Sequence, residues 1–305
     1  MKKLISSVSP HFHSPVTTQR IMLDVVLALL PAAVASVIIF GWRAALVIGV
    51  CVAVCVFSEW GFEKLCKKEN TITDLSAVVT GMLLAFNLPV TIPLWQAAFG
   101  SLAAIVVVKQ LFGGIGQNFA NPAITARIIM MTAFSGTMTA WVAPDGVSCA
   151  TPLALITKGE MSSLPSLSSM FLGLRGGCLG ETCILALLIG GAYLLIKRVI
   201  SWHTPVAFIG TVALMSLLCG KDVLYELMSG GLVLGAFFMA TDYSSSPATK
   251  PGKLIAGVFC GLITILIRFW GNFPEGVSFS ILLMNILTPY IERLTRAKPL
   301  GGVKR

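Results

Sequence analysis

The sequence predicts an all-α polytopic membrane protein with about ten transmembrane helices in two inverted five-helix repeats. The 305 residues are 56% hydrophobic and only 11% charged, and their mean hydropathy is +0.87. Because a soluble domain carries about 25% charged residues, the surface of this chain is expected to face lipid. Apolar runs recur along the chain between short polar joints, and several approach the roughly 20 residues that cross a bilayer core.

The first half of the chain supplies five predicted spans, which cover residues 21–40, 44–63, 75–88, 94–111 and 122–141. The third span is short for a full crossing and ends at Pro89. The fifth begins at Pro122, because proline suits the first turn of a helix and Asn121 suits the N-cap before it. Residues 1–20 form a polar segment that lacks the apolar core of a secretory signal.

Residues 142–180 are polar and rich in Pro, Gly and Ser, which predicts a long loop between the two halves. Five further apolar runs follow the loop and cover residues 182–196, 205–219, 224–241, 254–270 and 277–291. The predicted organisation is therefore a cytoplasmic N-terminal segment (1–20), a first transmembrane repeat (21–141), an outer loop (142–180), a second transmembrane repeat (181–292) and a basic cytoplasmic tail (293–305).

Membrane topology, rather than nucleic-acid binding, explains the net charge of +9. When residue 1 is placed in the cytoplasm and every span changes side, most of the 22 Lys and Arg residues fall on the inner side, Lys109 among them. Five fall on the outer side, namely Arg43, Lys158, Arg175, Lys221 and Arg268. This excess of inner cations predicts that both termini are cytoplasmic and that the 142–180 loop lies outside. No nucleic-acid partner is expected.

A weak internal repeat relates the two halves. Gly81–Asn87 (GMLLAFN) leads through Pro89 into an apolar span, and Gly235–Thr241 (GAFFMAT) leads through Pro247 into another. Because each half holds an odd number of spans, the two copies are expected to have opposite orientations, as in many transporters. The third and eighth spans, each followed by a proline, are candidates for broken helices around a central site.

The cysteines and histidines do not predict a metal site. The eight cysteines include no pair with the C-x-x-C spacing typical of zinc or iron–sulfur ligands. The three histidines are scattered near the boundaries of the predicted spans, at His11, His13 and His203. No metal ligand set is therefore expected within this chain.

The clearest local motif lies in the predicted outer loop and reads DGVSCATPL over residues 145–153. As local structure it indicates a turn followed by a helix. Asp145 and Gly146 favour a tight reversal, and Thr151 suits the N-cap of a helix that begins at Pro152. From the residues alone, a simple turn is at least as good an explanation as a functional motif.

Residues 145–153 resemble the flavinylation motif of the D-type subunit of Rnf complexes and of the related NqrB subunit. Three further stretches resemble the same family in the same order along the chain, namely residues 9–32, residues 93–123 with KQLFGGIGQNFANPA, and FFMATD at 237–242. NqrB chains are longer at the N-terminus, so the D-type subunits of Rnf complexes are the nearer match. One position departs from the pattern, because Cys149 stands where the family often has glycine.

The resemblance implies that a flavin transferase links flavin mononucleotide (FMN) through its phosphate to the hydroxyl of Thr151. It places Asp145, Ser148 and Ala150 beside this cofactor and allows a second, non-covalent flavin. It further implies an electron-transfer subunit, without activity alone, in a complex of the bacterial cytoplasmic (inner) membrane that couples ferredoxin:NAD electron transfer to Na⁺ or H⁺ translocation. The expected partners are the other Rnf subunits, including the G-type flavoprotein subunit, the flavin transferase during maturation, and membrane lipid.

Five other polar residues stand in or beside the predicted spans, and each has two explanations. Asn118 and Asn121 lie in a Gly-rich bend and either close turns or hold a flavin or an ion. Asp74 and Asp242 stand at the cytoplasmic ends of the third and eighth spans, where carboxylates either cap helices or line an ion route. Arg127 within the fifth span needs a partner, which is either the flavin phosphate or a neighbouring carboxylate.

A different class of function stays open beside the redox hypothesis. Inverted repeats with broken helices also build channels and secondary transporters that have no redox role. The motif at residues 145–153 distinguishes the two hypotheses, because a transporter has no evident use for a flavin attachment site.

Overall fold

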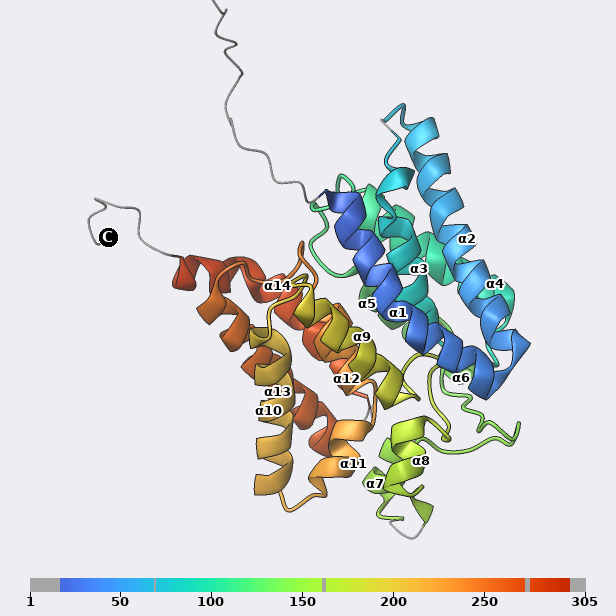
Figure 1. The fold of residues 1–305 in the computed structure, drawn as a ribbon, viewed down its shortest axis with the longest axis vertical. Helices are drawn as coiled ribbons and strands as arrows, with labels where there is room; N and C mark the ends of the chain where they lie inside the picture. The colour runs from blue at the N-terminus through green and yellow to red at the C-terminus, as the bar shows by residue number, and fades with distance from the viewer. Residues whose placement is uncertain (1–16, 69, 161–162, 272–274, 297–305) are drawn as a thin grey trace, which may run out of the picture.

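The computed structural model describes residues 17–68, 70–160, 163–271 and 275–296. The first half forms the helices α1 (Thr18–Phe40), α2 (Trp42–Leu65), η1 (Ile72–Asp74), α3 (Ser76–Phe86), α4 (Leu94–Leu102) with its π-helical continuation η2 (Ala103–Gln110), α5 (Pro122–Ala133) and α6 (Ser135–Met138). The connecting segment contains α7 (Pro152–Lys158) and α8 (Leu167–Leu172). The second half forms α9 (Ile184–Ile196), α10 (His203–Leu218), α11 (Val223–Met228), α12 (Leu232–Leu234) with the π-helical η4 (Gly235–Met239), α13 (Lys250–Trp270) and α14 (Val277–Thr295). Figure 1 shows their order.

The described helices are those of a protein that crosses a membrane several times. By length and composition, α1, α2 and α13 can each span a bilayer, and α3, α4 with η2, α5, α9 and α10 are shorter apolar helices. Large apolar side chains stand exposed on the outside of these helices, such as Ile38 (78% exposed) and Phe57 (69% exposed). Extended apolar surface of this kind faces lipid rather than water. The fold is an all-α multi-pass membrane protein.

Two of the predicted spans are broken inside the protein. The third is α3, which ends after 11 residues at Phe86 and therefore extends only about 16 Å, half of a bilayer core. The eighth is interrupted at residues 229–231, where Gly230 and Gly231 adopt φ values of 64° and 65°. The span expected at residues 224–241 is thus a broken helix, as the sequence indicates it could be, because these glycines supply the left-handed backbone that separates α11 from α12.

The fifth predicted span is also shorter than expected. The helix α5 ends at Ala133 instead of continuing to Trp141. Phe134 leaves the helical conformation (φ −133°, ψ 46°), and its ring packs edge-on against the rings of Trp95 and Phe99 in α4. Packing between helices, rather than local propensity, ends this helix.

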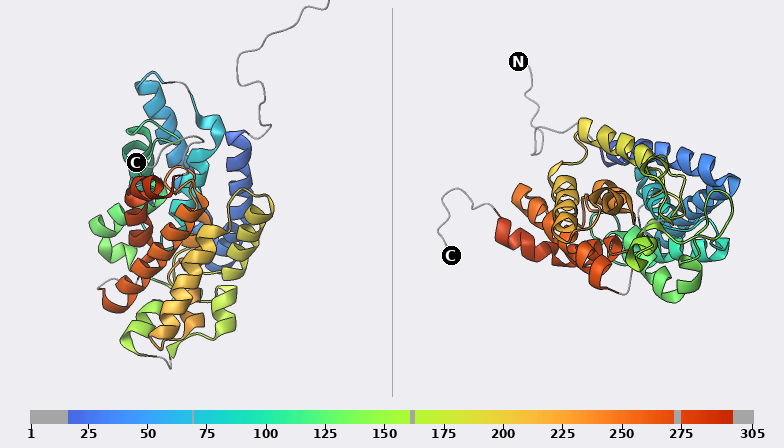
Figure 2. Two further views of the ribbon diagram at one scale, coloured as in Figure 1. Left: turned by 90° about the vertical axis from the view of Figure 1, so that its left-hand side faces the viewer. Right: turned by 90° about the horizontal axis from the view of Figure 1, so that it is seen from below.

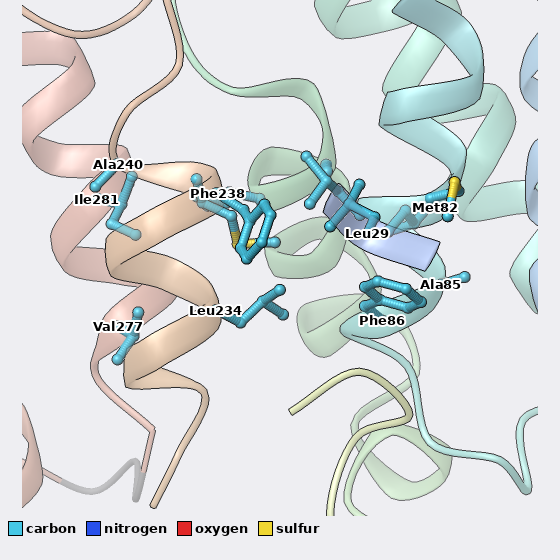
Figure 3. Close-up of a cluster of buried hydrophobic side chains, with 14 of the residues drawn as sticks. Leu29, Met82, Ala85, Phe86, Leu234, Phe238, Ala240, Val277 and Ile281 are labelled. Carbon is cyan, nitrogen blue, oxygen red and sulfur yellow. The ribbon is translucent and has the colours of Figure 1, made fainter. Parts of the chain in front are cut away.

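The two halves pack side by side, with the first in blue to green and the second in yellow to red (Figure 1). At the junction α1 packs against α9 and α5 packs against α14, so equivalent helices of the two halves meet in pairs. Figure 3 shows Leu29, Met82 and Phe86 of the first half opposite Leu234 and Phe238 of the second. Met82 lies above Phe86 in that view whereas Leu234 lies below Phe238, so α3 and the α12–η4 helix run in opposite directions, as inverted repeats require.

The molecule has two distinct ends, seen in Figure 1 and again in Figure 2. The start of α1 and the end of α14 lie at one end, which we call the terminal end. The short helices α7, α8 and α11 lie at the other, which we call the loop end. The motif at residues 145–153, which leads into α7, is therefore at the loop end.

The segment at 142–180 is only partly a surface loop. Its last residues enter the protein, where Cys178 and Leu179 are fully buried. The N–H of Leu179 donates to the carbonyl of Leu88 (3.0 Å), and the N–H of Gly180 donates to the carbonyl of Phe86 (3.0 Å). These bonds satisfy the carbonyl of Phe86, which the short helix α3 leaves free at its C-terminal end, and that of Leu88 just after the helix. The prediction of a simple loop up to Gly180 is therefore incomplete.

Candidate functional site

The motif at residues 145–153 folds as a hairpin turn followed by a short helix. Val142 and Ser148 form an antiparallel bridge, the only pairing of this type among the described residues. Gly146 lies in the left-handed region (φ 80°), as the Asp-Gly turn predicts. Asp145, Ser148 and Ala150 are exposed on the hairpin. The motif thus presents its polar residues at the loop end of the molecule.

Thr151 is the N-cap of α7, which begins at Pro152. Its Oγ1 accepts a hydrogen bond from the N–H of Ala154 (3.3 Å), and the residue is 5% exposed. None of the described residues accepts the proton of this hydroxyl. The oxygen is therefore oriented by one hydrogen bond while its O–H bond is uncommitted, but the hairpin has to open before a large group can reach it.

Two contacts connect the motif to the protein interior. Leu153 of α7 is buried and lies against Gly230, beside the break between α11 and α12. The Sγ of Cys149 occupies the space that a side chain at Gly176 would fill. Burial at this contact raises the pKa of the Cys149 thiol, although a hydrogen bond from Gly176 acts in the opposite direction. The motif is thus packed directly on the segment that enters the protein.

A cluster of charges is buried between the end of α3 and the start of α14. Arg127 of α5 forms an ion pair with Glu275 and donates to Asn87 Oδ1 (2.7 Å) and Ser278 Oγ (3.1 Å). Its second amino group lies 3.5 Å from the Sγ of Cys178. The sequence leaves open whether the partner of Arg127 is a flavin phosphate or a neighbouring carboxylate. In the structure the partner is the carboxylate of Glu275.

A second arginine and a second glutamate extend this cluster. Arg175 donates to the backbone carbonyl of Glu181 (2.9 Å), and Glu181 Oε1 accepts the N–H of Cys178 (3.3 Å). The thiol of Cys178 and the carboxylates of Glu181 and Glu275 lie within 4.8 Å of one another. Two arginines and two glutamates meet here, so the charges of the cluster are balanced by protein groups and a metal ion is not needed to balance them.

Two more buried ion pairs lie nearer the two ends of the molecule. At the terminal end, Nζ of Lys109 in η2 binds Glu59 of α2 (2.6 Å) and the hydroxyl of Ser76 in α3 (2.5 Å). At the loop end, Arg268 of α13 binds Glu226 of α11 (3.0 Å). Each pair ties together helices that are separate in the sequence.

Three of the cations that the sequence assigns to one side of the membrane are buried in the protein. Lys109, assigned to the inner side, is 3% exposed, and Arg175 and Arg268, assigned to the outer side, are 4% and 1% exposed. The signal that points to the pairs is the presence of Glu59 and Glu226 inside predicted spans. An unpaired carboxylate is costly there, so each one predicts a cation partner.

A cavity at the terminal end brings together three residues that the sequence singles out. Asn118, Asn121 and Asp242 line it together with Lys109. Asn121 also caps α5 and donates to the carbonyl of Met239 at the end of η4 (3.3 Å). The turn-closing explanation therefore holds for Asn121, while its place in the cavity leaves a ligand role open.

The two aspartates both accept local hydrogen bonds. Asp74 Oδ1 accepts from the N–H (2.8 Å) and the hydroxyl (2.5 Å) of Ser76, the first residue of α3. Asp242 Oδ2 accepts from the hydroxyls of Ser244 (3.0 Å) and Ser245 (2.8 Å). Asp74 thus accepts the N–H of the first residue of α3, although the N-cap position itself is Leu75, and Asp242 presents its carboxylate at the wall of the cavity.

Comparison with known proteins shows the family to which this chain belongs. A family model described as the NQR2, RnfD, RnfE family matches residues 5–301. The chain belongs to the NQR2, RnfD, RnfE family. It is 49% identical to the D-type subunit of the Na(+)-translocating ferredoxin:NAD(+) oxidoreductase complex of Acetobacterium woodii, over 99% of this chain and 96% of the relative.

Two other members of the NQR2, RnfD, RnfE family show that membership does not decide which ion moves. The chain is 41% identical to the D-type subunit of the proton-translocating ferredoxin:NAD(+) oxidoreductase complex of Clostridium ljungdahlii, over 97% of this chain and 95% of the relative. It is 38% identical to the D-type subunit of the ion-translocating oxidoreductase complex of Stutzerimonas stutzeri, over 93% of this chain and 92% of the relative. Proteins named for Na⁺ and for protons are thus both similar to this chain.

In this member of the NQR2, RnfD, RnfE family, the residues that the sequence singles out lie in three separate places. The loop end holds Asp145, Ser148, Ala150 and Thr151. Arg127 lies in the interior. The terminal end holds Asp74, Asn118, Asn121 and Asp242. The structure therefore does not bring Asn118, Asn121 or Arg127 to the hydroxyl of Thr151.

Proposed function

We propose that this chain carries FMN covalently on Thr151 and passes electrons as the D-type subunit of an Rnf-type complex. That complex couples ferredoxin:NAD electron transfer to the translocation of Na⁺ or H⁺. The names of the most similar relatives support the complex. The observation that carries the flavin proposal is the hydroxyl of Thr151, which is oriented, has an uncommitted O–H bond, and lies in the motif at the loop end.

The residues around Thr151 suit such a group. Attachment by the flavin transferase would break the O–H bond of Thr151 and the bond from phosphorus to the leaving group of an activated FMN donor. It would form an Oγ–P bond and release the proton and the leaving group, while the oxygen keeps a lone pair for the N–H of Ala154. A small cavity of about 100 Å³ at the other end of α7 is lined by Ile156, Gly159, Lys221, Asp222 and Tyr225. Because it is too small for a flavin ring, we assign the ring to no cavity and expect it to extend from Thr151 at the loop end. The bound flavin supplies the electron-accepting chemistry, and the protein positions and tunes it.

The test is the fluorescence of the denatured chain under ultraviolet light after production together with a flavin transferase. We expect a fluorescent band for the wild type and for Thr151→Ser, which keeps a hydroxyl, and none for Thr151→Val. Thr157→Val is the matched control, because Thr157 is an exposed threonine on the same short helix whose hydroxyl donates to the carbonyl of Ala154 (2.9 Å). A dark wild-type band would favour a channel or secondary transporter instead.

The proposal extends to the surroundings of the chain. We place it in the bacterial cytoplasmic (inner) membrane with the terminal end, and both termini, on the cytoplasmic side and Thr151 on the outer side. The partners are other Rnf subunits, including the G-type flavoprotein subunit, and the flavin transferase during maturation. The separation of the start of α1 and the end of α14 from α7 supports this orientation, since it puts the motif on the side opposite to them.

We further propose that the translocated ion enters the protein at the cavity of the terminal end that Asn118, Asn121 and Asp242 line. Asp242, Asn118 and Asn121 offer oxygen ligands there, and Asp74 reaches its wall through Ser76. The proposal includes a second, non-covalent flavin, to which no cavity is assigned. Asp242→Asn is expected to reduce ion transport by the assembled complex without removing the fluorescence of the denatured chain. Loss of that fluorescence together with transport would contradict the separation of the two functions.

A further inference from the structure

A second cavity at the terminal end has no part in the proposed redox function. It lies between the start of α10 and the connection from η4 to α13, and it has a volume of about 230 Å³. Its wall is both polar and apolar. The residues that matter for its chemistry are Ser201, Thr204, Ser246 and Lys253 on the polar side and Val199 and Pro247 on the apolar side.

The polar side of this cavity offers donors without partners. The helix α10 has 16 residues and no side-chain cap at its N-terminus. Its first turn offers the free N–H groups of His203 and Thr204, because Pro205 has no N–H and the N–H of Val206 donates to the carbonyl of Trp202 (3.1 Å). Thr204 in that first turn is 2% exposed and lines the cavity, and its hydroxyl has no hydrogen-bond partner among the described residues. Lys253 on the opposite wall has no carboxylate within 4.0 Å in the described part of the chain.

The acidic groups near the cavity are already engaged. Asp242 accepts hydrogen bonds from Ser244 and Ser245. Glu292 of α14 accepts the N–H of Ala248 (3.0 Å). The cavity therefore combines a helix N-terminus, a buried hydroxyl and an unpaired ammonium group, which is the donor set that binds a phosphate.

The surface around the cavity points to lipid as the source of that phosphate. Tyr243, which lines the cavity, and Trp202, which follows the lining residue Ser201 in the chain, are both exposed, as aromatic residues are at the level of the lipid headgroups. Below the rim, Val206, Leu214 and Leu217 form an exposed apolar stripe at helical spacing along α10. We propose that this cavity binds the headgroup phosphate of an anionic phospholipid whose acyl chains lie along the stripe on α10.

The test is the binding of phosphatidylglycerol to the purified full-length chain, followed by native mass spectrometry. Lys253→Gln is expected to weaken binding about fivefold, the effect of one lysine on an anionic headgroup. Lys250→Gln is the matched control, because Lys250 is exposed on the same helix and does not line the cavity, and we expect less than about a twofold effect. Lys253→Arg keeps the charge and is expected to restore binding.

Two outcomes would overturn the proposal. Equal affinities for Lys253→Gln and Lys250→Gln would show that the cavity does not select the headgroup. Displacement of the lipid by an equal concentration of inorganic phosphate would show a site for free phosphate instead of lipid. Gel filtration and flavin fluorescence of each variant separate a failure to fold or to bind flavin from a failure to bind lipid.

Discussion

Arg127 illustrates how single charged residues are accommodated inside this protein. Its guanidinium group meets the amide of Asn87 after α3 and, at the start of α14, the carboxylate of Glu275 and the hydroxyl of Ser278. Removing one partner of a buried ion pair leaves the other charge uncompensated, which costs more than replacing both partners by apolar groups. Losing Arg127 or Glu275 alone is therefore expected to destabilise the protein more than replacing both by apolar residues.

Glu275→Gln is expected to lower the free energy of unfolding by about 3–5 kcal/mol, because Arg127 then lacks its counter-charge. The double variant Arg127→Met, Glu275→Leu is expected to lose less than the single variant. Titration with a denaturing detergent measures both, and Glu160→Gln, an exposed glutamate, serves as the control. Equal losses for the single and the double variant would contradict the pairing.

At the scale of elements, the two broken helices determine where polar residues enter the protein. The break at residues 229–231 separates α11 from α12, and the end of α3 at Phe86 is completed by the buried residues Leu179 and Gly180. A Cβ at Gly231 would approach Glu181 Oε2 to 2.9 Å, in addition to the strain of its φ of 65°. The break is therefore expected to tolerate only glycine.

Gly231→Ala is expected to lower the free energy of unfolding by at least about 1–2 kcal/mol, since the left-handed conformation alone costs that much for a residue with a Cβ. The matched control is Gly210→Ala in α10, where a Cβ meets nothing within 4 Å. That control should leave stability unchanged or slightly raised. The same detergent titration applies, and equal stability of the two variants would contradict the role of the break.

The elements that sequence predicts well are those whose ends are set by local chemistry. The start of α5 at Pro122 with Asn121 as its cap, and the start of α7 at Pro152 with Thr151 as its cap, both follow from capping preferences. The end of α5 does not, because it depends on the ring of Phe134 packing against α4.

The features of the candidate site also divide into those that neighbouring residues predict and those that depend on contacts between distant segments. The turn at Gly146 and the capping hydroxyl of Thr151 can be predicted from neighbouring residues. The burial of Arg175 and the pairing of Arg268 with Glu226 join segments far apart in the sequence, and the rule that assigns cations to membrane sides treats such residues as surface charges. Spacing alone also cannot reveal that Asn118 and Thr151 lie at opposite ends of the molecule.

At the scale of the whole molecule, the two ends differ in chemistry, and the buried charge cluster around Arg127 and Glu275 lies in the interior between them. The loop end carries the motif with Thr151, and the terminal end carries the cavity with Asp242. The proposed orientation puts the end with Thr151 on the outer side of the membrane and the end with Asp242 on the cytoplasmic side. Two exposed cysteines report on that orientation, because Cys66 follows α2 at the terminal end and Cys219 follows α10 at the loop end.

A membrane-impermeant maleimide applied to intact cells is expected to label a variant that retains only Cys219 and to leave a variant that retains only Cys66 unlabelled. Both should be labelled after the membrane is permeabilised. Cys149, which also lies on the outer side in the proposed orientation, is less suitable as a reporter because burial raises the pKa of its thiol. Labelling of Cys66 in intact cells would reverse the proposed orientation.

The most direct test of the central claim is the intact mass of the full-length chain, produced together with a flavin transferase and denatured to remove non-covalent ligands. We predict a wild-type chain heavier than its amino acids by one FMN less the water lost in forming the ester, and a Thr151→Val chain without that addition. A wild-type chain that weighs only as much as its amino acids, in cells where the same transferase modifies another substrate, would contradict the claim.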